Sequence, residues 1–263
     1  MVFTSRHAVL VFGSAALMTF STPVFAQTTP PGQTPPAVPA APPPPPPGWT
    51  GSFGAGLALT QGNSDTSTVN VAYDVKRDTG SNVLFKSAGL YIRGESEGAL
   101  TTDRLAFDAR LERKLSARTS LYGAVQYLSD EFKRIDYLAS PTVGIAQLLM
   151  KTDRTEFAVD AGVGMVWEKN PGFEVKTDGA LTAGQNFKHK LTETAELTQR
   201  TSALWKMDDF DDGLYIFGVG LAANITAQTQ LKAELLDTFK NRPPTADVKK
   251  NDVAMLLSFV FKY

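Results

Sequence analysis

The stretch Asp252-Val-Ala-Met-Leu-Leu-Ser-Phe-Val-Phe-Lys-Tyr263 decides the fold class. Every second residue from Val253 to Tyr263 is apolar or aromatic, Asp252 precedes this series, and the positions within it include Ser258 and Lys262. Successive side chains of a β-strand point to opposite faces, so this period of two predicts a strand with one uniformly apolar face. A face of this kind is expected where a strand of a β-barrel meets lipid.

The same period of two recurs along the chain from Trp49 onward. Its apolar faces contain Val69, Val71, Tyr73 and Val75; Leu105, Phe107, Ala109 and Leu111; Phe157, Val159, Ala161, Val163, Met165 and Trp167; Tyr215, Phe217, Val219, Leu221 and Ala223; and Leu231, Ala233, Leu235 and Phe239. Turn-forming residues divide residues 49–263 into twelve strands, with ten or fourteen as the alternatives. Strands can satisfy their backbone hydrogen bonds in lipid only by closing into a barrel. We therefore predict an all-β, antiparallel transmembrane β-barrel.

The predicted connections alternate in length. After a medium connection at 61–65, long loops are expected at 94–102, 129–136, 168–176, 206–213 and 240–252, and short turns at 78–81, 116–119, 151–154, 188–190 and 224–229. Long loops on one side and short turns on the other are typical of outer-membrane barrels. An even number of strands returns the chain to its starting side, so we expect both ends of the barrel in the periplasm.

The segment before the barrel has two parts. Residues 1–26 combine Arg6, an apolar run from Ala8 to Phe20 and a Val24-Phe25-Ala26 cleavage site, an order that predicts a secretory signal peptide. A retained membrane anchor is the alternative, but the run is shorter than the roughly 18 residues that a spanning helix needs. Residues 27–48 are rich in Pro and Ala and include six consecutive prolines. We expect this segment to be an extended periplasmic linker, with a docking site for a periplasmic partner as the alternative.

Composition excludes some classes of function. The chain has no cysteine, so disulfides and thiolate metal sites are excluded. Loss of Arg6 with the signal peptide changes the formal net charge from −1 to −2. A chain so close to neutral offers no electrostatic reason to expect a nucleic-acid partner.

Several short motifs carry a resemblance to a known family. They are Trp49-Thr-Gly51, Gly56, Thr60-Gln-Gly-Asn-Ser64, Tyr122, Gln126-Tyr127, Asp130, Phe132, Ile135-Asp136, Gly162-Val-Gly164 and Phe259-Val-Phe-Lys-Tyr263. The chain resembles the salt-induced outer-membrane protein family, a β-barrel family of unknown function. This resemblance implies an outer-membrane location in a Gram-negative envelope and a link to salt stress, but no mechanism. The chain has Tyr137-Leu138 where such proteins usually have an arginine.

The end of the last strand also resembles a targeting signal. Phe259, Phe261 and Tyr263 are similar to the aromatic terminal signal that the barrel-assembly machinery reads in outer-membrane proteins. We therefore expect this machinery, outer-membrane lipid and lipopolysaccharide as partners of the chain.

The sequence offers little for catalysis. Of its two histidines, His7 lies in the predicted signal peptide, and His189 lies in the predicted short turn between Lys188 and Lys190. Barrel proteases and phospholipases need a general base, commonly histidine, close to a nucleophile or a water. We therefore predict no catalytic site and no cofactor.

One acidic loop is a candidate metal site. Asp208, Asp209, Asp211 and Asp212 offer several carboxylate oxygens, the ligand that Ca²⁺ prefers. The loop lacks the spacing and the glycine of a known calcium loop, so a solvated acidic loop is the alternative. If it binds a divalent cation, that cation would bridge to lipopolysaccharide phosphates.

The inward faces of the predicted strands carry mixed charges. The candidates for lining the lumen are Asp74, Lys76, Arg104, Asp108, Arg110, Glu112, Glu156, Asp160, Asp178, Glu196, Arg200, Lys232 and Glu234. Charges of opposite sign on the walls of a barrel can pair across its interior, because unpaired buried charge is costly. Two functions follow as alternatives: a narrow pore for small solutes or ions associated with salt or osmotic stress, or a non-conducting structural barrel anchored by its Pro-rich segment.

Overall fold

The computed structural model describes residues 48–60 and 66–263. The predicted signal peptide (1–26), the Pro-rich segment except Gly48, and the 61–65 connection lie outside these residues. The described chain forms β1 (Gly48–Thr60), β2 (Thr66–Asp78), β3 (Val83–Ser96), β4 (Ala99–Lys114), β5 (Thr119–Asp130), β6 (Ile135–Lys151), β7 (Thr155–Lys169), β8 (Lys176–Lys190), β9 (Ala195–Lys206), β10 (Gly213–Asn224), β11 (Thr229–Lys240) and β12 (Asn251–Lys262). Within the same residues, no helix is long and apolar enough to cross a membrane.

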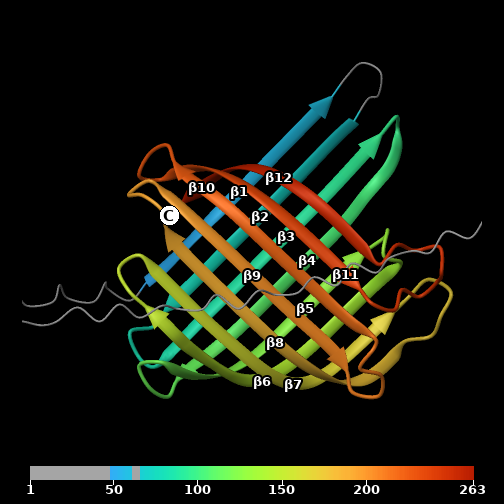
Figure 1. Ribbon diagram of the computed structural model, residues 1–263, viewed down its shortest axis with the longest axis horizontal. Coiled ribbons are helices and arrows are strands. Elements are labelled where there is room, and N and C mark those ends of the chain that lie inside the picture. The colour runs from blue at the N-terminus through green and yellow to red at the C-terminus, as the bar shows by residue number, and fades with distance from the viewer. Residues whose placement is uncertain (1–47, 61–65) are drawn as a thin grey trace, which may run out of the picture. The chain divides into compact units, whose positions relative to one another are not determined.

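The twelve strands form a closed antiparallel barrel (Figure 1). Each strand pairs with its neighbours in the chain, and β1 pairs with β12 to close the ring. This arrangement confirms the predicted fold class and strand number. β1 begins and β12 ends at the same end of the barrel.

The closing seam is shorter than the other pairings. β1 and β12 are in register only from Ser52↔Lys262 to Ala55↔Phe259, whereas β1 and β2 pair along their full lengths. The seam is extended by Gly51 and Tyr263, whose backbone N–H groups each donate to the other's carbonyl oxygen at 3.1 Å. Closure of the ring therefore rests on few backbone contacts.

The outer and inner faces of the wall differ in chemistry. Large apolar residues alternate along the strands and are exposed on the outer face: Phe53, Leu57, Leu111, Val143, Val163, Leu221, Leu231, Met255 and Phe259. Met255 is 71% exposed, the largest value in this set. Directly paired residues of antiparallel strands share a face, so the register assigns the intervening, more polar positions to the interior.

One predicted long loop is wrong. Residues 94–102 were expected to form a loop, but β3 continues to Ser96 and β4 begins at Ala99. The turn residues Glu97 and Gly98 have φ angles of 52° and 76°, and positive φ at both central positions is the geometry of a tight hairpin turn. A register shift between Gly94 and Glu95 absorbs the irregularity as a β-bulge.

One predicted short turn is also wrong. Residues 188–190 were expected to form a turn, but they are the last residues of β8, and the turn follows at 191–194. We call the end with connections 79–82, 115–118, 152–154, 191–194 and 225–228 the turn end, and the end with 97–98, 131–134, 170–175, 207–212 and 241–250 the loop end. The predicted difference in length between the connections of the two ends holds only from β7 onward, because the loop-end connections 97–98 and 131–134 are as short as those of the turn end.

Candidate functional site

The interior of the barrel gathers the charged side chains that the sequence singles out. Asp74, Lys76, Arg104, Asp108, Arg110, Glu112, Glu156, Asp160, Asp178, Glu196, Arg200, Lys232 and Glu234 all lie at positions opposite the apolar outer face. Their surroundings differ: some are exposed to water, some are linked by ion pairs, and others lie near buried apolar clusters.

The level nearest the turn end is open to water. Asp74 and Lys76 on β2, Glu156 on β7 and Arg200 on β9 are exposed although their side chains face inward. Lys188 on β8 is 54% exposed while it pairs with Glu196 at 2.9 Å. An inward charge that is exposed needs water beside it, so the interior is solvated in this half.

One arginine links inward charges of several strands. The Arg110 guanidinium on β4 lies 2.7 Å from the Glu112 carboxylate and 3.2 Å from Asp160, which belongs to β7. It also lies over the Tyr122 ring, 3.6 Å from the ring centroid, a cation–π geometry. Lys86 on β3 pairs with the same Glu112 at 2.9 Å. One charge network thus links β3, β4 and β7.

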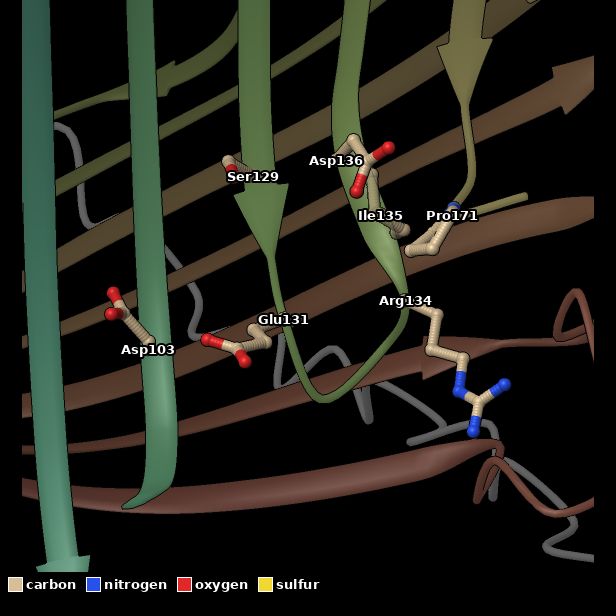
Figure 2. A pocket seen from close by; sticks show the side chains of 7 residues that line it. All are labelled: Asp103, Ser129, Glu131, Arg134, Ile135, Asp136 and Pro171. Carbon is tan, nitrogen blue, oxygen red and sulfur yellow. The ribbon is translucent and has the colours of Figure 1, made fainter. Parts of the chain in front are cut away.

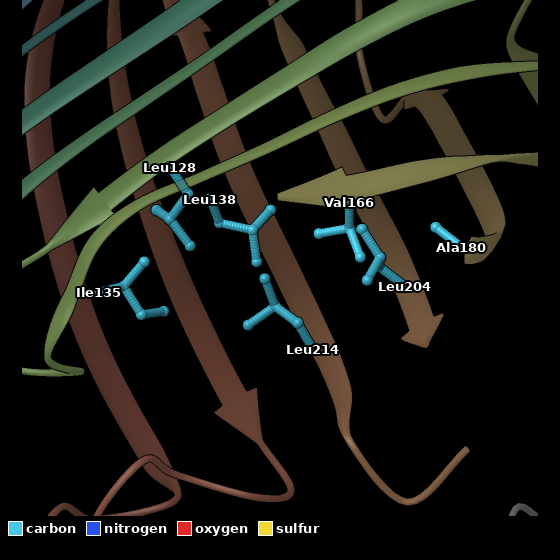
Figure 3. Close-up of a cluster of buried hydrophobic side chains, with 7 residues drawn as sticks. All are labelled: Leu128, Ile135, Leu138, Val166, Ala180, Leu204 and Leu214. Atoms are coloured by element: carbon cyan, nitrogen blue, oxygen red, sulfur yellow. The ribbon is translucent and has the colours of Figure 1, made fainter. Parts of the chain in front are cut away.

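The level nearest the loop end is filled by apolar side chains. Leu128, Ile135, Leu138, Val166, Ala180, Leu204 and Leu214 form one buried cluster inside the wall from β5 to β10 (Figure 3). Ile92, Leu236 and Leu256 form a second buried cluster inside β3, β11 and β12. Both clusters lie at inward strand positions towards the loop end.

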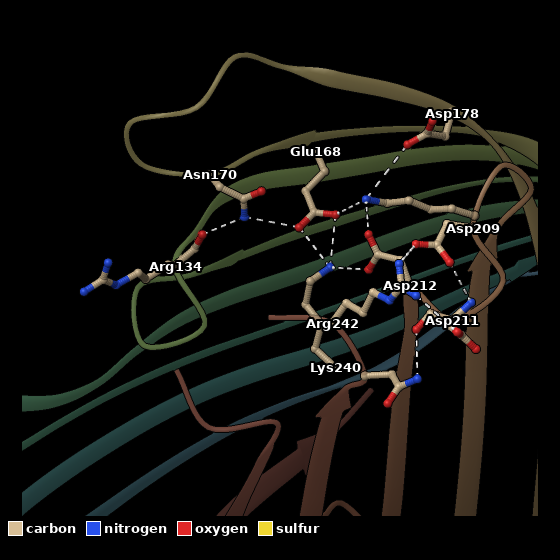
Figure 4. Close-up of polar contacts among 11 residues, drawn as sticks. Arg134, Glu168, Asn170, Asp178, Asp209, Asp211, Asp212, Lys240 and Arg242 are labelled. Atoms are coloured by element: carbon tan, nitrogen blue, oxygen red, sulfur yellow. Dashed lines mark hydrogen bonds and ion pairs between the residues drawn. The ribbon is translucent and has the colours of Figure 1, made fainter. Parts of the chain in front are cut away.

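A buried charge network lies beside this apolar layer (Figure 4). The Glu168 carboxylate on β7 accepts from Lys206 at 2.8 Å and from Lys240 at 2.9 Å. Asp212 pairs with the same two lysines at 2.7 and 3.3 Å. Glu168, Lys206 and Lys240 are almost fully buried. Asp178 also lies 3.9 Å from the Lys206 ammonium group, so two lysines pair with three carboxylates in this network.

A second contact crosses the interior at this level. The buried Arg104 guanidinium on β4 donates to the Thr238 hydroxyl on β11 and lies 3.7 Å from the Asp130 carboxylate on β5. β4 and β11 stand on different sides of the ring, separated on the shorter path by four strands. Arg104 therefore connects two sides of the barrel interior and is already bound, so it differs from the water-exposed charges that line the lumen.

A loop-to-loop latch covers the loop end. Lys133, in the 131–134 connection, is fully buried. Its ammonium group donates to the Lys249 and Lys250 carbonyl oxygens at 2.9 and 2.7 Å and pairs with Asp252 at 2.9 Å. Arg134 pairs with Asp247 of the same opposite loop at 2.9 Å. We call these contacts of Lys133 and Arg134 with residues 247–252 the latch.

A family model described as "Protein of unknown function, DUF481" matches residues 53–263. This chain belongs to the DUF481 family. Among curated proteins, none matches the chain.

Solved structures similar to this DUF481 chain are barrels. The translocator domain of the autotransporter NalP from Neisseria meningitidis is 12% identical, with a TM-score of 0.44 over 82% of this chain and 87% of that one. The COG4313 outer membrane channel from Pseudomonas putida F1 is 16% identical, with a TM-score of 0.46 over 82% and 95%. The KdgM porin is 7% identical, with a TM-score of 0.42 over 81% and 99%. Likenesses this distant carry no information on what the DUF481 barrel binds or conducts.

The four aspartates of the acidic loop, the candidate metal site of the sequence, have different surroundings. In the DUF481 barrel, Asp209 and Asp211 pair with Arg242, Asp212 pairs with the two buried lysines, and Asp208 is exposed. Within residues 48–60 and 66–263, no group of three or more His, Cys, Asp or Glu side chains is arranged to hold a metal ion. Lysine and arginine side chains therefore pair with three of the four carboxylates.

A small pocket lies beside the 131–134 connection (Figure 2). Its volume is about 450 Å³, and its lining includes Asp103, Glu131 and Asp136. Asp103 pairs with Arg93 at 3.4 Å, and the Arg134 side chain pairs with Asp247 instead of closing the pocket. These carboxylates do not converge on a common point (Figure 2), so the pocket is a weaker candidate for a functional site than the interior of the barrel.

His189 lies on the outer face of the wall. It is paired with Thr155 on β7, and its Nδ1 lies 2.8 Å from the Thr155 hydroxyl. Its ring stacks on Phe187 with 6.2 Å between centroids. The histidine thus belongs to an aromatic group at the turn end of the barrel.

Sequence reasoning missed the residues that close the interior. It placed Glu168, Lys206 and Lys240 at the borders of long loops, whereas each is within the last two residues of its strand. Each continues the inward period of its strand, two residues after Val166, Leu204 and Thr238. This continuation is the signal that would have found them.

Proposed function

We propose that this protein is an outer-membrane β-barrel whose interior is a narrow pore for small solutes or ions, closed at the loop end in the conformation described above. Transfer of exposed apolar surface from water into lipid is favourable, and the outer face carries such surface around the ring. The observation that supports a pore is a set of inward charges that are exposed to water: Asp74, Lys76, Glu156 and Arg200.

The direction of the pore follows from its ends. The open, solvated half lies at the turn end, and the apolar layer and the latch lie at the loop end. In outer-membrane barrels the short turns face the periplasm. We infer that solute reaches the interior freely from the periplasmic side and that the extracellular mouth is the controlled one. A role in salt or osmotic stress belongs to this proposal through the family resemblance.

A second function is favoured by the closure itself. Two apolar clusters, the Glu168 network and the latch would also suit a barrel that never conducts. In that case the barrel would be a structural or stress-response element, anchored towards the periplasm by its Pro-rich segment.

Ion selectivity in planar bilayers tests the pore. Replacing two inward, exposed cations, Lys76→Gln with Arg200→Gln, removes positive charge from the solvated half and is expected to shift the reversal potential towards cation selectivity. Arg113→Gln is the matched control, because Arg113 is exposed on the outer face near the turn end. Heat-modifiable migration on gels verifies folding of each variant. Folded protein that never conducts supports the structural alternative, and conduction with an unchanged reversal potential excludes this lining.

A further inference from the structure

The outer face of β8 and β9 carries polar side chains in the middle of the apolar surface. Gln185 is the register partner of Val159 on β7, and Gln199 is the partner of Val219 on β10. Both valines belong to the apolar outer face, so both amides face outward. Thr201 lies directly opposite Gln185 and shares that face. We call Gln185, Gln199 and Thr201 the amide patch.

Hydrogen bonds within the amide patch use only part of its capacity. The Gln185 Nε2 donates to the Gln199 Oε1 at 2.7 Å, and the Gln199 Nε2 donates to the Thr201 hydroxyl oxygen at 2.7 Å. Each carboxamide has two N–H donors, and these bonds use one from each. A donor or acceptor that faces hydrocarbon without a partner costs free energy. The remaining N–H groups, the Gln185 carbonyl and the Thr201 hydroxyl therefore favour a polar partner within the membrane.

The surface next to the amide patch is shallow. Ala183 and Ala203 are direct register partners, one pair further towards the loop end. Small side chains let two membrane-embedded backbones approach closely, which brings short polar side chains within reach of each other. On β12, by contrast, the outward positions carry Met255, Leu257 and Phe259, which suit lipid chains.

We propose that the amide patch and the Ala183–Ala203 pair form an interface between two copies of this chain in the membrane. A carboxamide both donates and accepts, so the patch is complementary to itself across a two-fold axis. Two convex barrels meet along a narrow line, and the patch spans only the adjacent strands β8 and β9. The proposal rests on the proposed membrane location but not on conduction.

The absence of cysteine from the sequence allows a direct cross-linking test. Ala183→Cys is introduced into the otherwise unchanged chain, which is folded into lipid vesicles and oxidised. A covalent dimer is expected, because position 183 of one copy would lie close to position 183 of the other copy near the two-fold axis. Ala109→Cys is the matched control, since Ala109 lies on the outer face of β4, far from β8 in the ring. The control is expected to remain monomeric.

A mass measurement on a patch variant completes the test. The unaltered folded protein in mild detergent is expected to have the mass of two chains, and Gln185→Leu with Gln199→Leu and Thr201→Val is expected to have the mass of one. These replacements make the face more apolar, so insertion into vesicles and heat-modifiable migration should persist. A folded, inserted protein that is monomeric overturns the interface while leaving the membrane location intact. A patch variant that remains dimeric also overturns it. Failure of the unaltered protein to insert contradicts the membrane location instead.

Discussion

The Glu168 carboxylate of β7 and the Lys240 ammonium group of β11 form an ion pair of 2.9 Å, although three strands separate them in the wall. Glu168 is 2% exposed, so water screens this pair little. Glu168 also pairs with Lys206 of β9, which pairs in turn with Asp212, so these charges connect β7, β9 and β11 at the loop end. This buried contact across the interior is part of the closure that we propose for the loop end.

Removing the shared anion should destabilise the barrel. Glu168→Ala leaves the two buried lysines with Asp212 and with the more distant Asp178, and breaking a buried pair from one side costs about 3–5 kcal/mol. We expect a lower urea midpoint for unfolding of the protein folded in detergent or lipid, followed by tryptophan fluorescence. Glu174→Ala, in the exposed 170–175 loop, is the control and should leave the midpoint unchanged. An unchanged midpoint for Glu168→Ala would show that the network contributes nothing to stability.

The short seam between β1 and β12 should be sensitive to one glycine. A Cβ at Gly56 would collide with the Leu257 carbonyl oxygen and with the Asn70 amide nitrogen. The Ser258 hydroxyl donates to the Asn70 side-chain oxygen at 2.7 Å, so the collision would disturb a contact that supports the seam. Gly56→Ala is expected to reduce the yield of heat-modifiable, folded barrel. At Gly123 a Cβ would meet nothing within 4 Å, so Gly123→Ala should fold as the unaltered chain does. Equal yields for the two variants would contradict this account.

A carboxylate on the outer face should lower the unfolding stability of the barrel in lipid. Asp237 is the register partner of Phe217 and Val253, both exposed on the apolar face, and one of its carboxylate oxygens is buried without a hydrogen-bond partner. Asp237→Leu is expected to raise unfolding stability in lipid by up to about 1 kcal/mol, because a lipid-facing acidic residue is unfavourable. Asp153→Leu, in an exposed turn, is the comparison and should have no such effect. A destabilised Asp237→Leu barrel would show that the carboxylate has a partner in the membrane.

Period-two alternation predicted the wall of the barrel well. The apolar series that ends in Tyr263 depends only on which face each side chain takes, a property local to each strand. The strand number, the closure and the inward positions of residues such as Arg110 and Glu234 follow from the same alternation. Turn positions were predicted less well, because polar residues are common in turns, whereas Lys188 and Glu95 lie within strands here.

The closure of the loop end could not be predicted from the same pattern. Arg104 and Thr238 are 134 residues apart in the chain, and Lys133 and Lys250 are 117 apart. Their contacts depend on which strands face each other across the ring and on the height of each residue, which strand periodicity does not specify. The ion pairs of the acidic loop could not be predicted for the same reason, since Arg242 and Lys240 approach this loop only in the folded barrel.

Single-channel conductance of a latch variant tests the central claim most directly. Lys133→Ala with Arg134→Ala removes the side-chain contacts that hold the 131–134 connection to residues 247–252. Lys114→Ala is the matched control, because Lys114 pairs with Asp78 at 3.1 Å at the turn end. If the interior is a pore closed at its loop end, the latch variant will be open for a larger fraction of time than the unaltered protein and the control. Folded latch variant that remains as silent as the unaltered protein would contradict a pore held closed by this latch.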